Sequence, residues 1–79
     1  MGEHTVEVEV PADWDDDDRL VFLQQALRAR PELLGPSVGA DRHRHVIDVT
    51  VTVQAPSESA ARNIAGRAVL DELARLGLL

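Results

Sequence analysis

The clearest pattern in the chain is an alternation of apolar and polar positions that passes directly into a helical pattern. Isoleucine or valine occupies every second position from 47 to 53, with polar residues between them. This alternation predicts a strand over 45–54 with one buried and one wet face. After it, Ser57 begins a predicted helix that ends near Gly77, a C-cap candidate. The inward face of this helix is predicted to hold Ala61, Ile64, Ala65, Ala68, Val69, Leu73 and Leu76.

The N-terminal stretch shows the same alternation. Valine stands at positions 6, 8 and 10, with threonine or glutamate between. We therefore expect a strand over Thr5–Val10, which Pro11 ends because proline has no N–H to donate. A short strand is predicted over Ser37–Ala40, with Val38 and Ala40 inward, and a polar turn over 41–44 joins it to the strand at 45–54.

Leucine spacing predicts a helix in the first half of the chain. Leu20, Leu23 and Leu27 lie at i, i+3 and i+7, which places them on one helical face. The aspartates at 13–18 supply an N-cap and negative charge where the helix dipole is positive. Pro31 ends the helix at about residue 30.

The order of these elements predicts the fold class. Strand, helix, strand, strand, helix over residues 1–79 forms a single α+β domain. We expect a three-stranded antiparallel sheet with both helices on one face, and a right-handed crossover from the first strand to the second.

Composition narrows the functional classes. The chain has 14 acidic and 8 basic residues, a formal net charge of −6, and no cysteine. Because nucleic acids and anionic membranes are bound by basic patches, an acidic domain disfavours both and favours a basic partner. Disulfides and thiolate catalysis are excluded. Neither a secretory leader nor an apolar run of about 18 residues is present, so we expect a cytoplasmic protein.

The stretch 49–62, a Val/Thr strand followed by Ala-Pro-Ser and an Ala/Arg helix, resembles small ferredoxin-like proteins of high-G+C bacteria. The whole chain resembles a ferredoxin-like domain that ends before its fourth strand. This resemblance implies a fold and a bacterial source, and it brings no function with it. The topology is also similar to regulatory domains of the ACT type, which implies a dimer that senses a small ligand. Those domains have a glycine-containing turn after strand one, whereas residues 11–14 here are Pro-Ala-Asp-Trp.

The absent fourth strand makes the first strand an expected open edge, which invites pairing with another chain. In self-pairing, Glu7 and Glu9 would meet their own copies, and like charges placed opposite destabilise by about 0.2–1 kcal/mol per pair. The interface residues predicted along this edge are Thr5, Val6, Glu7, Val8 and Glu9.

A second predicted interface lies on the last helix and after it. Leu70 is opposite Ala61 on the helical wheel, and with Leu78 and Leu79 it could form an exposed apolar patch. Trp14 either anchors a partner or packs over the first helix.

Two further sets of side chains could carry chemistry. His43 and His45 share a face if the chain is extended there, so they could bind one metal ion, or they could simply keep a turn polar. Glu72 falls within the buried arc of the last helix, where it could act as a general acid or pair with Arg75 or Arg19.

No arrangement of nucleophile, base and phosphate loop is recognisable, so we expect no enzyme and no cofactor. The sequence favours a non-catalytic module that self-associates or docks on a partner protein. The alternative is an ACT-like domain that senses a small ligand as a dimer.

Overall fold

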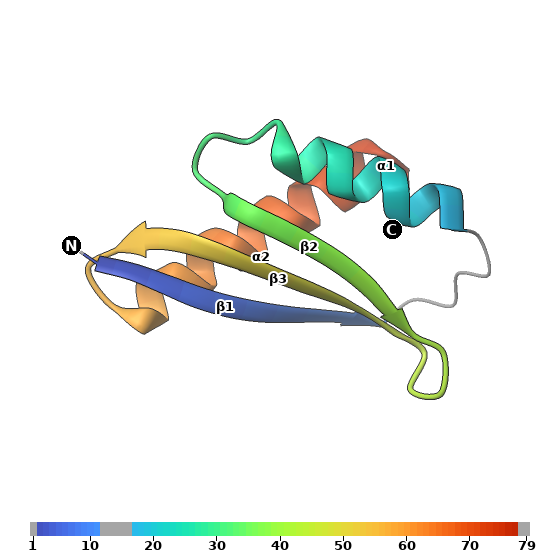
Figure 1. Cartoon of the computed structure of the whole chain (residues 1–79), viewed down its shortest axis with the longest axis horizontal. Coiled ribbons are helices and arrows are strands. Elements are labelled where there is room, and N and C mark those ends of the chain that lie inside the picture. Colours follow the sequence, from blue (N-terminus) through green and yellow to red (C-terminus); the bar gives the residue numbers. More distant parts are fainter. Residues whose placement is uncertain (1, 12–16, 78–79) are drawn as a thin grey trace.

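The computed structural model describes residues 2–11 and 17–77, which form three strands and two helices. They follow the predicted order β-α-β-β-α, with the chain colours of Figure 1 tracing the path. Trp14, Leu78 and Leu79 lie outside the described residues. The elements are β1 (Gly2–Pro11), α1 (Asp17–Arg28), β2 (Leu34–Asp41), β3 (Val46–Ala55) and α2 (Glu58–Arg75).

The sheet is antiparallel and has the order β1-β3-β2. The central strand β3 is flanked by β1 on one side and β2 on the other, so the predicted three-stranded antiparallel sheet is confirmed. Val6 lies opposite Val51, and Glu9 lies opposite Asp48. This register aligns the apolar positions of both strands on one face of the sheet and their polar positions on the other.

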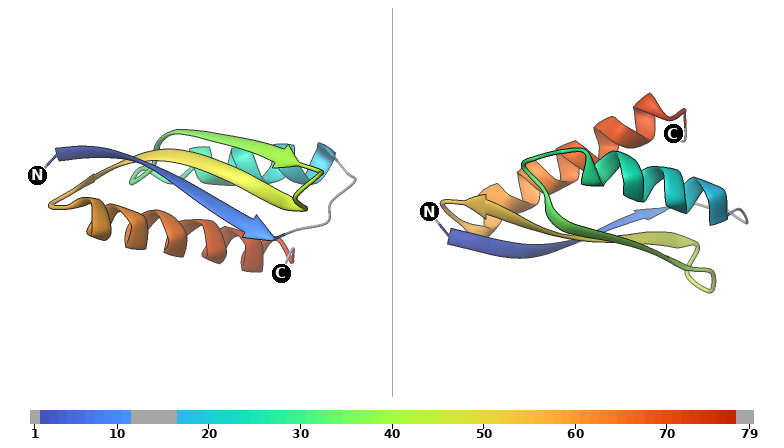
Figure 2. Two further views of the ribbon diagram at one scale, coloured as in Figure 1. Left: turned by 90° about the horizontal axis from the view of Figure 1, so that it is seen from below. Right: turned by 45° about the horizontal axis from the view of Figure 1, so that its top comes forward.

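Both helices pack on the apolar face, and the second view of Figure 2 shows the two layers. Helix α2 lies against β1 and β3, whereas α1 lies against β2 and contacts α2. The central strand β3 contributes four almost fully buried residues, Ile47, Val49, Val51 and Val53. Neither helix has the length and apolar character that crossing a membrane requires. The buried apolar residues are Val6, Val10, Leu23, Leu27, Leu33, Ile47, Val49, Val51, Val53, Ala55, Ala61, Ala65, Ala68, Val69 and Leu73.

Strand pairing makes β1 and β2 longer than the alternation predicts. Strand β1 starts at Gly2, opposite Ala55, because the ladder to β3 continues past the alternating positions. Strand β2 covers Leu34–Asp41 and contains a register shift between Leu34 and Ser37. Ala40, predicted to be inward, is exposed beside the turn.

The ends of both helices follow local hydrogen bonds. Helix α1 stops at Arg28, two residues before the predicted end, and the N–H of Arg30 donates to the carbonyl of Leu27 at 3.1 Å. The predicted start of α2 is confirmed, because Ser57 is its N-cap and its Oγ accepts the N–H of Ala60 at 3.1 Å. Gly77 follows the last turn at φ +71°, a left-handed conformation that suits glycine.

The buried face of α2 differs from the predicted face at two positions. Ile64 and Leu76 remain 37% and 38% exposed, so their assignment to the core was wrong. Glu72 lies in the buried arc, as predicted, and is only 2% exposed. The helix crosses a narrow three-stranded sheet, so residues at the margins of its apolar arc extend past the cover that the sheet provides.

Candidate interaction surface

In the described part of the chain, the outer edge of β1 is the longest stretch of strand backbone that is not paired with another strand. Strand β1 pairs with β3 along one side, and no described strand lies along the other. In an antiparallel strand, every second residue directs both its N–H and its C=O to the same side. The ten-residue strand Gly2–Pro11 therefore presents a series of backbone donors and acceptors to a further strand. The predicted interface residues Thr5, Val6, Glu7, Val8 and Glu9 lie in its central part.

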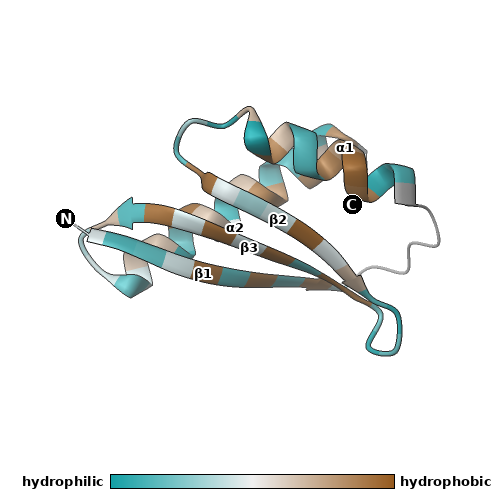
Figure 3. Ribbon diagram, in the orientation of Figure 1, coloured by the Kyte–Doolittle hydropathy of each residue, from teal (hydrophilic) through white to brown (hydrophobic). Residues whose placement is uncertain are grey.

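The two faces of β1 have different chemistry, which the alternating colours along the strand in Figure 3 display. Val6 and Val10 are buried under α2, while Val8 between them is half-buried. The opposite face carries Glu7 and Glu9, which are exposed. A strand added at this edge would meet an apolar, helix-covered side and an acidic, open side.

Three carboxylates gather on the open side because of the pairing of β1 with β3. Ligand oxygens of Glu7, Glu9 and Asp48 all lie within 4.8 Å of one another. The Oδ1 atom of Asp48 is buried and accepts no hydrogen bond from the described residues. Like charges at such separations repel, so this cluster favours the approach of a cation.

Arg44 supplies part of the balancing charge. Its Nη1 and Nη2 donate to the two carboxylate oxygens of Glu9 at 3.1 and 2.8 Å. These hydrogen bonds, and the charge of Glu9 itself, raise the pKa of the Arg44 guanidinium above its ordinary value. Asp41 holds the turn in place, since its Oδ1 accepts the N–H groups of His43 and Arg44 at 3.1 and 3.2 Å. The turn thus carries one arginine to the end of the acidic face.

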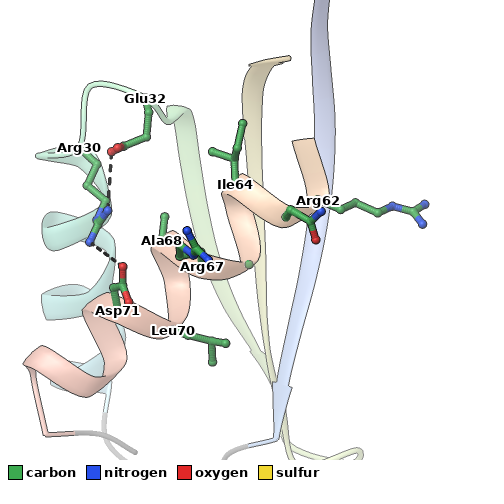
Figure 4. A pocket seen from close by; sticks show the side chains of 10 residues that line it. Arg30, Glu32, Arg62, Ile64, Arg67, Ala68, Leu70 and Asp71 are labelled. Carbon is green, nitrogen blue, oxygen red and sulfur yellow. Dashed lines mark ion pairs between the residues drawn. The ribbon is translucent and has the colours of Figure 1, made fainter. Parts of the chain in front are cut away.

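Leu70 is an exposed apolar residue on α2, the helix that packs against β1. Its side chain is 50% exposed, which agrees with its predicted place outside the core face. In Figure 4, Leu70 and Arg62 project from α2 toward the side where β1 lies, away from Arg30 and Glu32. In that view, Leu70 points to the side of α2 on which β1 lies.

A shallow open groove runs along the outer surface of α2. At one end, Arg30 lies between Glu32 at 3.8 Å and Asp71 at 3.9 Å, the two ion pairs dashed in Figure 4. Because these acids already offset the charge of Arg30, this end of the groove is poorly suited to holding an anion. The lining residues are Arg30, Glu32, Arg62, Asn63, Ile64, Gly66, Arg67, Ala68, Leu70 and Asp71.

Glu72 belongs to the link between the end of α1 and α2. Its Oε1 accepts Arg30 Nε at 2.8 Å and Arg75 Nη1 at 3.4 Å, and its Oε2 is buried with no partner among the described residues. The predicted pairing with Arg75 is confirmed. Arg30 makes the shorter contact, and sequence reasoning missed it because the two residues are 42 positions apart. The geometry favours a structural role for this carboxylate.

The two histidines of the predicted metal pair lie in the turn between β2 and β3. His45 adopts φ +54°, so the extended conformation on which that prediction relied is absent. Strand β3 consequently begins at Val46, one residue later than predicted. Within residues 2–11 and 17–77, the group of three side chains close enough to share one ion is the acidic cluster described above, and neither histidine belongs to it.

Comparisons of the chain with protein-family models, with curated proteins and with solved structures found no match.

Proposed function

We propose that this protein is a non-catalytic interaction module that binds an extended segment of another protein chain by adding it as a fourth strand along β1. The observation that carries this proposal is the position of β1, a ten-residue strand at an edge of the sheet. Strand addition is an established mode of peptide recognition in which backbone hydrogen bonds supply affinity and alternating side chains supply specificity.

The edge provides enough interactions for such a role. Each backbone hydrogen bond contributes about 0.5–1.5 kcal/mol net, so four bonds along the edge would contribute roughly 2–6 kcal/mol before the entropy of ordering the segment is subtracted. Covering the half-buried Val8 and the exposed Leu70 would add apolar burial. The sum suits a reversible complex of moderate affinity.

Several features that commonly protect an edge strand are missing from the middle of β1. Natural proteins shield edges with proline, lysine or bulges. Proline occurs only at its last position, Pro11, and the register with β3 is regular from Gly2 to that residue. The glutamates are the remaining protective device, and they leave the backbone accessible to a partner of suitable charge.

Amide hydrogen exchange measured by NMR tests the proposal. In the isolated protein, alternate amides of β1 should exchange rapidly, because they point away from β3. With synthetic nine-residue strand-forming peptides at millimolar concentration, those same amides should become protected while amides of β2 stay unchanged. If no peptide, whatever its charge, protects any β1 amide, strand addition at this edge is wrong.

A further inference from the structure

We infer that the segment that occupies the β1 edge is a strand with lysine or arginine at alternate positions and apolar residues between them. This inference rests on the proposed strand addition and specifies the chemistry of the partner. It also excludes a second copy of the same strand as the preferred occupant.

Self-pairing of β1 places carboxylates opposite each other. A closed dimer needs a two-fold axis, so the two copies of β1 would run antiparallel. For the helices of both copies to cover the same face of the joined sheet, odd-numbered residues must lie opposite odd-numbered residues. An axis at Glu7 sets this residue opposite its own copy. An axis at Val6 sets Glu3 opposite Glu9, and an axis at Thr5 sets Glu3 opposite Glu7. Each register that overlaps well therefore contains like charges at the closest cross-strand distance, which destabilises the pairing.

A basic strand turns the same positions into favourable contacts. Residues directly opposite on neighbouring strands have Cβ atoms about 4.5–5.5 Å apart, and long side chains also reach the diagonal neighbours. A lysine or arginine opposite Glu7 would therefore approach the cluster of Glu7, Glu9 and Asp48, in which Glu9 already pairs with Arg44. The unpartnered Oδ1 of Asp48 is part of the same negative region.

The alternate positions of the partner would face the helices. On that side the strand would cover half-buried Val8 and approach Leu70, which points to the side of α2 on which β1 lies. Apolar side chains suit these contacts. The aliphatic stem of Arg62 extends in the same direction as Leu70 and can lie against the apolar side chains of the partner. The guanidinium of Arg62 pairs with Glu58 at 2.9 Å. The pattern that fits is therefore strict alternation of basic and apolar residues.

Three nine-residue peptides that share valine at the alternate positions test the inference. They carry lysine, threonine or glutamate at the remaining positions, and binding is followed by calorimetry and by the exchange of β1 amides. We expect the lysine peptide to bind on the order of tenfold more tightly than the threonine peptide at low salt, and the glutamate peptide to bind most weakly. The advantage of lysine should shrink as salt shortens the range of the charges.

Charge variants locate the effect. Glu7→Gln should weaken binding of the lysine peptide by several-fold and leave the threonine peptide unaffected. Glu32→Gln is the matched control, because it removes one carboxylate from the connection between α1 and β2, on the other side of α2 from β1. This variant should bind both peptides as the parent protein does.

The outcomes separate the two levels of the proposal. Equal protection of β1 by the lysine and threonine peptides, with no effect of Glu7→Gln, would overturn the basic partner and leave strand addition in place. Protection by none of the peptides would overturn strand addition itself. A dimer at about 100 μM whose β1 amides are protected without peptide would identify the second copy as the occupant and reject the inference.

Discussion

The ion pair between Arg30 and Glu72 ties the end of α1 to α2, and we expect Arg30→Met to destabilise the fold strongly. Methionine keeps most of the apolar stem and removes the guanidinium. It leaves a carboxylate that is 2% exposed with Arg75 at 3.4 Å as its remaining described partner. The perturbation therefore isolates a nearly buried charge.

The magnitude follows from the burial of the two partners. Removing one member of a buried pair costs about 3–5 kcal/mol. The Arg30 side chain is 24% exposed and Arg75 remains nearby, so a loss of about 2–3 kcal/mol is expected. Against a total stability of roughly 4–12 kcal/mol for a chain of this length, such a loss is large.

Removing the other member of the ion pair should change the free energy of unfolding only slightly. Glu72→Leu removes the buried carboxylate together with its unpartnered Oε2, and Arg30 keeps its contacts with Glu32 and Asp71. We expect a change within about 1 kcal/mol of either sign, since replacing buried charge by apolar volume is often neutral. In the double variant, Arg30→Met should cost much less than it does alone, because no buried charge remains unpaired.

Urea denaturation followed by circular dichroism measures these differences, and Arg62→Met is the matched control. Arg62 and Glu58 form an exposed i,i+4 pair with side chains 69% and 64% exposed, so this control should cost no more than about 0.5 kcal/mol. If Arg30→Met costs as little as the control, or if the double variant is as unstable as Arg30→Met alone, the structural role assigned to Glu72 is refuted.

Three smaller predictions concern single residues; urea denaturation measures their effects on stability, and peptide calorimetry measures the effect of the third on binding. Ser57→Ala should cost about 1 kcal/mol, because the N–H of Ala60 loses its capping oxygen; an unchanged midpoint would mean that water replaces the cap fully. Gly35→Ala should cost about 1 kcal/mol through its φ of +58° alone, since nothing lies within 4 Å of the added methyl. Gly39 is equally uncrowded and has no positive φ, so Gly39→Ala should not destabilise the fold. Equal effects of the two substitutions would contradict this reasoning. Leu70→Ala should change stability by less than about 0.5 kcal/mol because the side chain is half exposed, yet weaken binding of the lysine peptide; unchanged binding would remove Leu70 from the interaction surface.

The elements and their order could be predicted from periodicity because each pattern is local. Alternating valines in β1 and β3, and the serine cap of α2, report conformation without reference to the rest of the chain. The edge position of β1 was predicted from the order of the five elements, and the sheet order β1-β3-β2 agrees with it. These predictions needed only the order of the elements.

What the sequence did not yield depends on contacts between distant residues or on single backbone angles. The register that brings Asp48 beside Glu7 and Glu9, and the pairing of Arg30 with Glu72, arise from packing. The left-handed conformation of His45 occurs at a residue type that does not demand it. For this reason the acidic cluster came from the structure, while the histidine pair was placed on an extended strand that does not exist there.

Exchange protection of β1 in the presence of the lysine peptide tests strand addition most directly. We predict that alternate amides between Gly2 and Pro11 exchange rapidly in the free protein and slow markedly when the peptide binds, with β2 unaffected. Protection confined to α2 or β2, with β1 unchanged, would contradict the assignment of the β1 edge as the binding site.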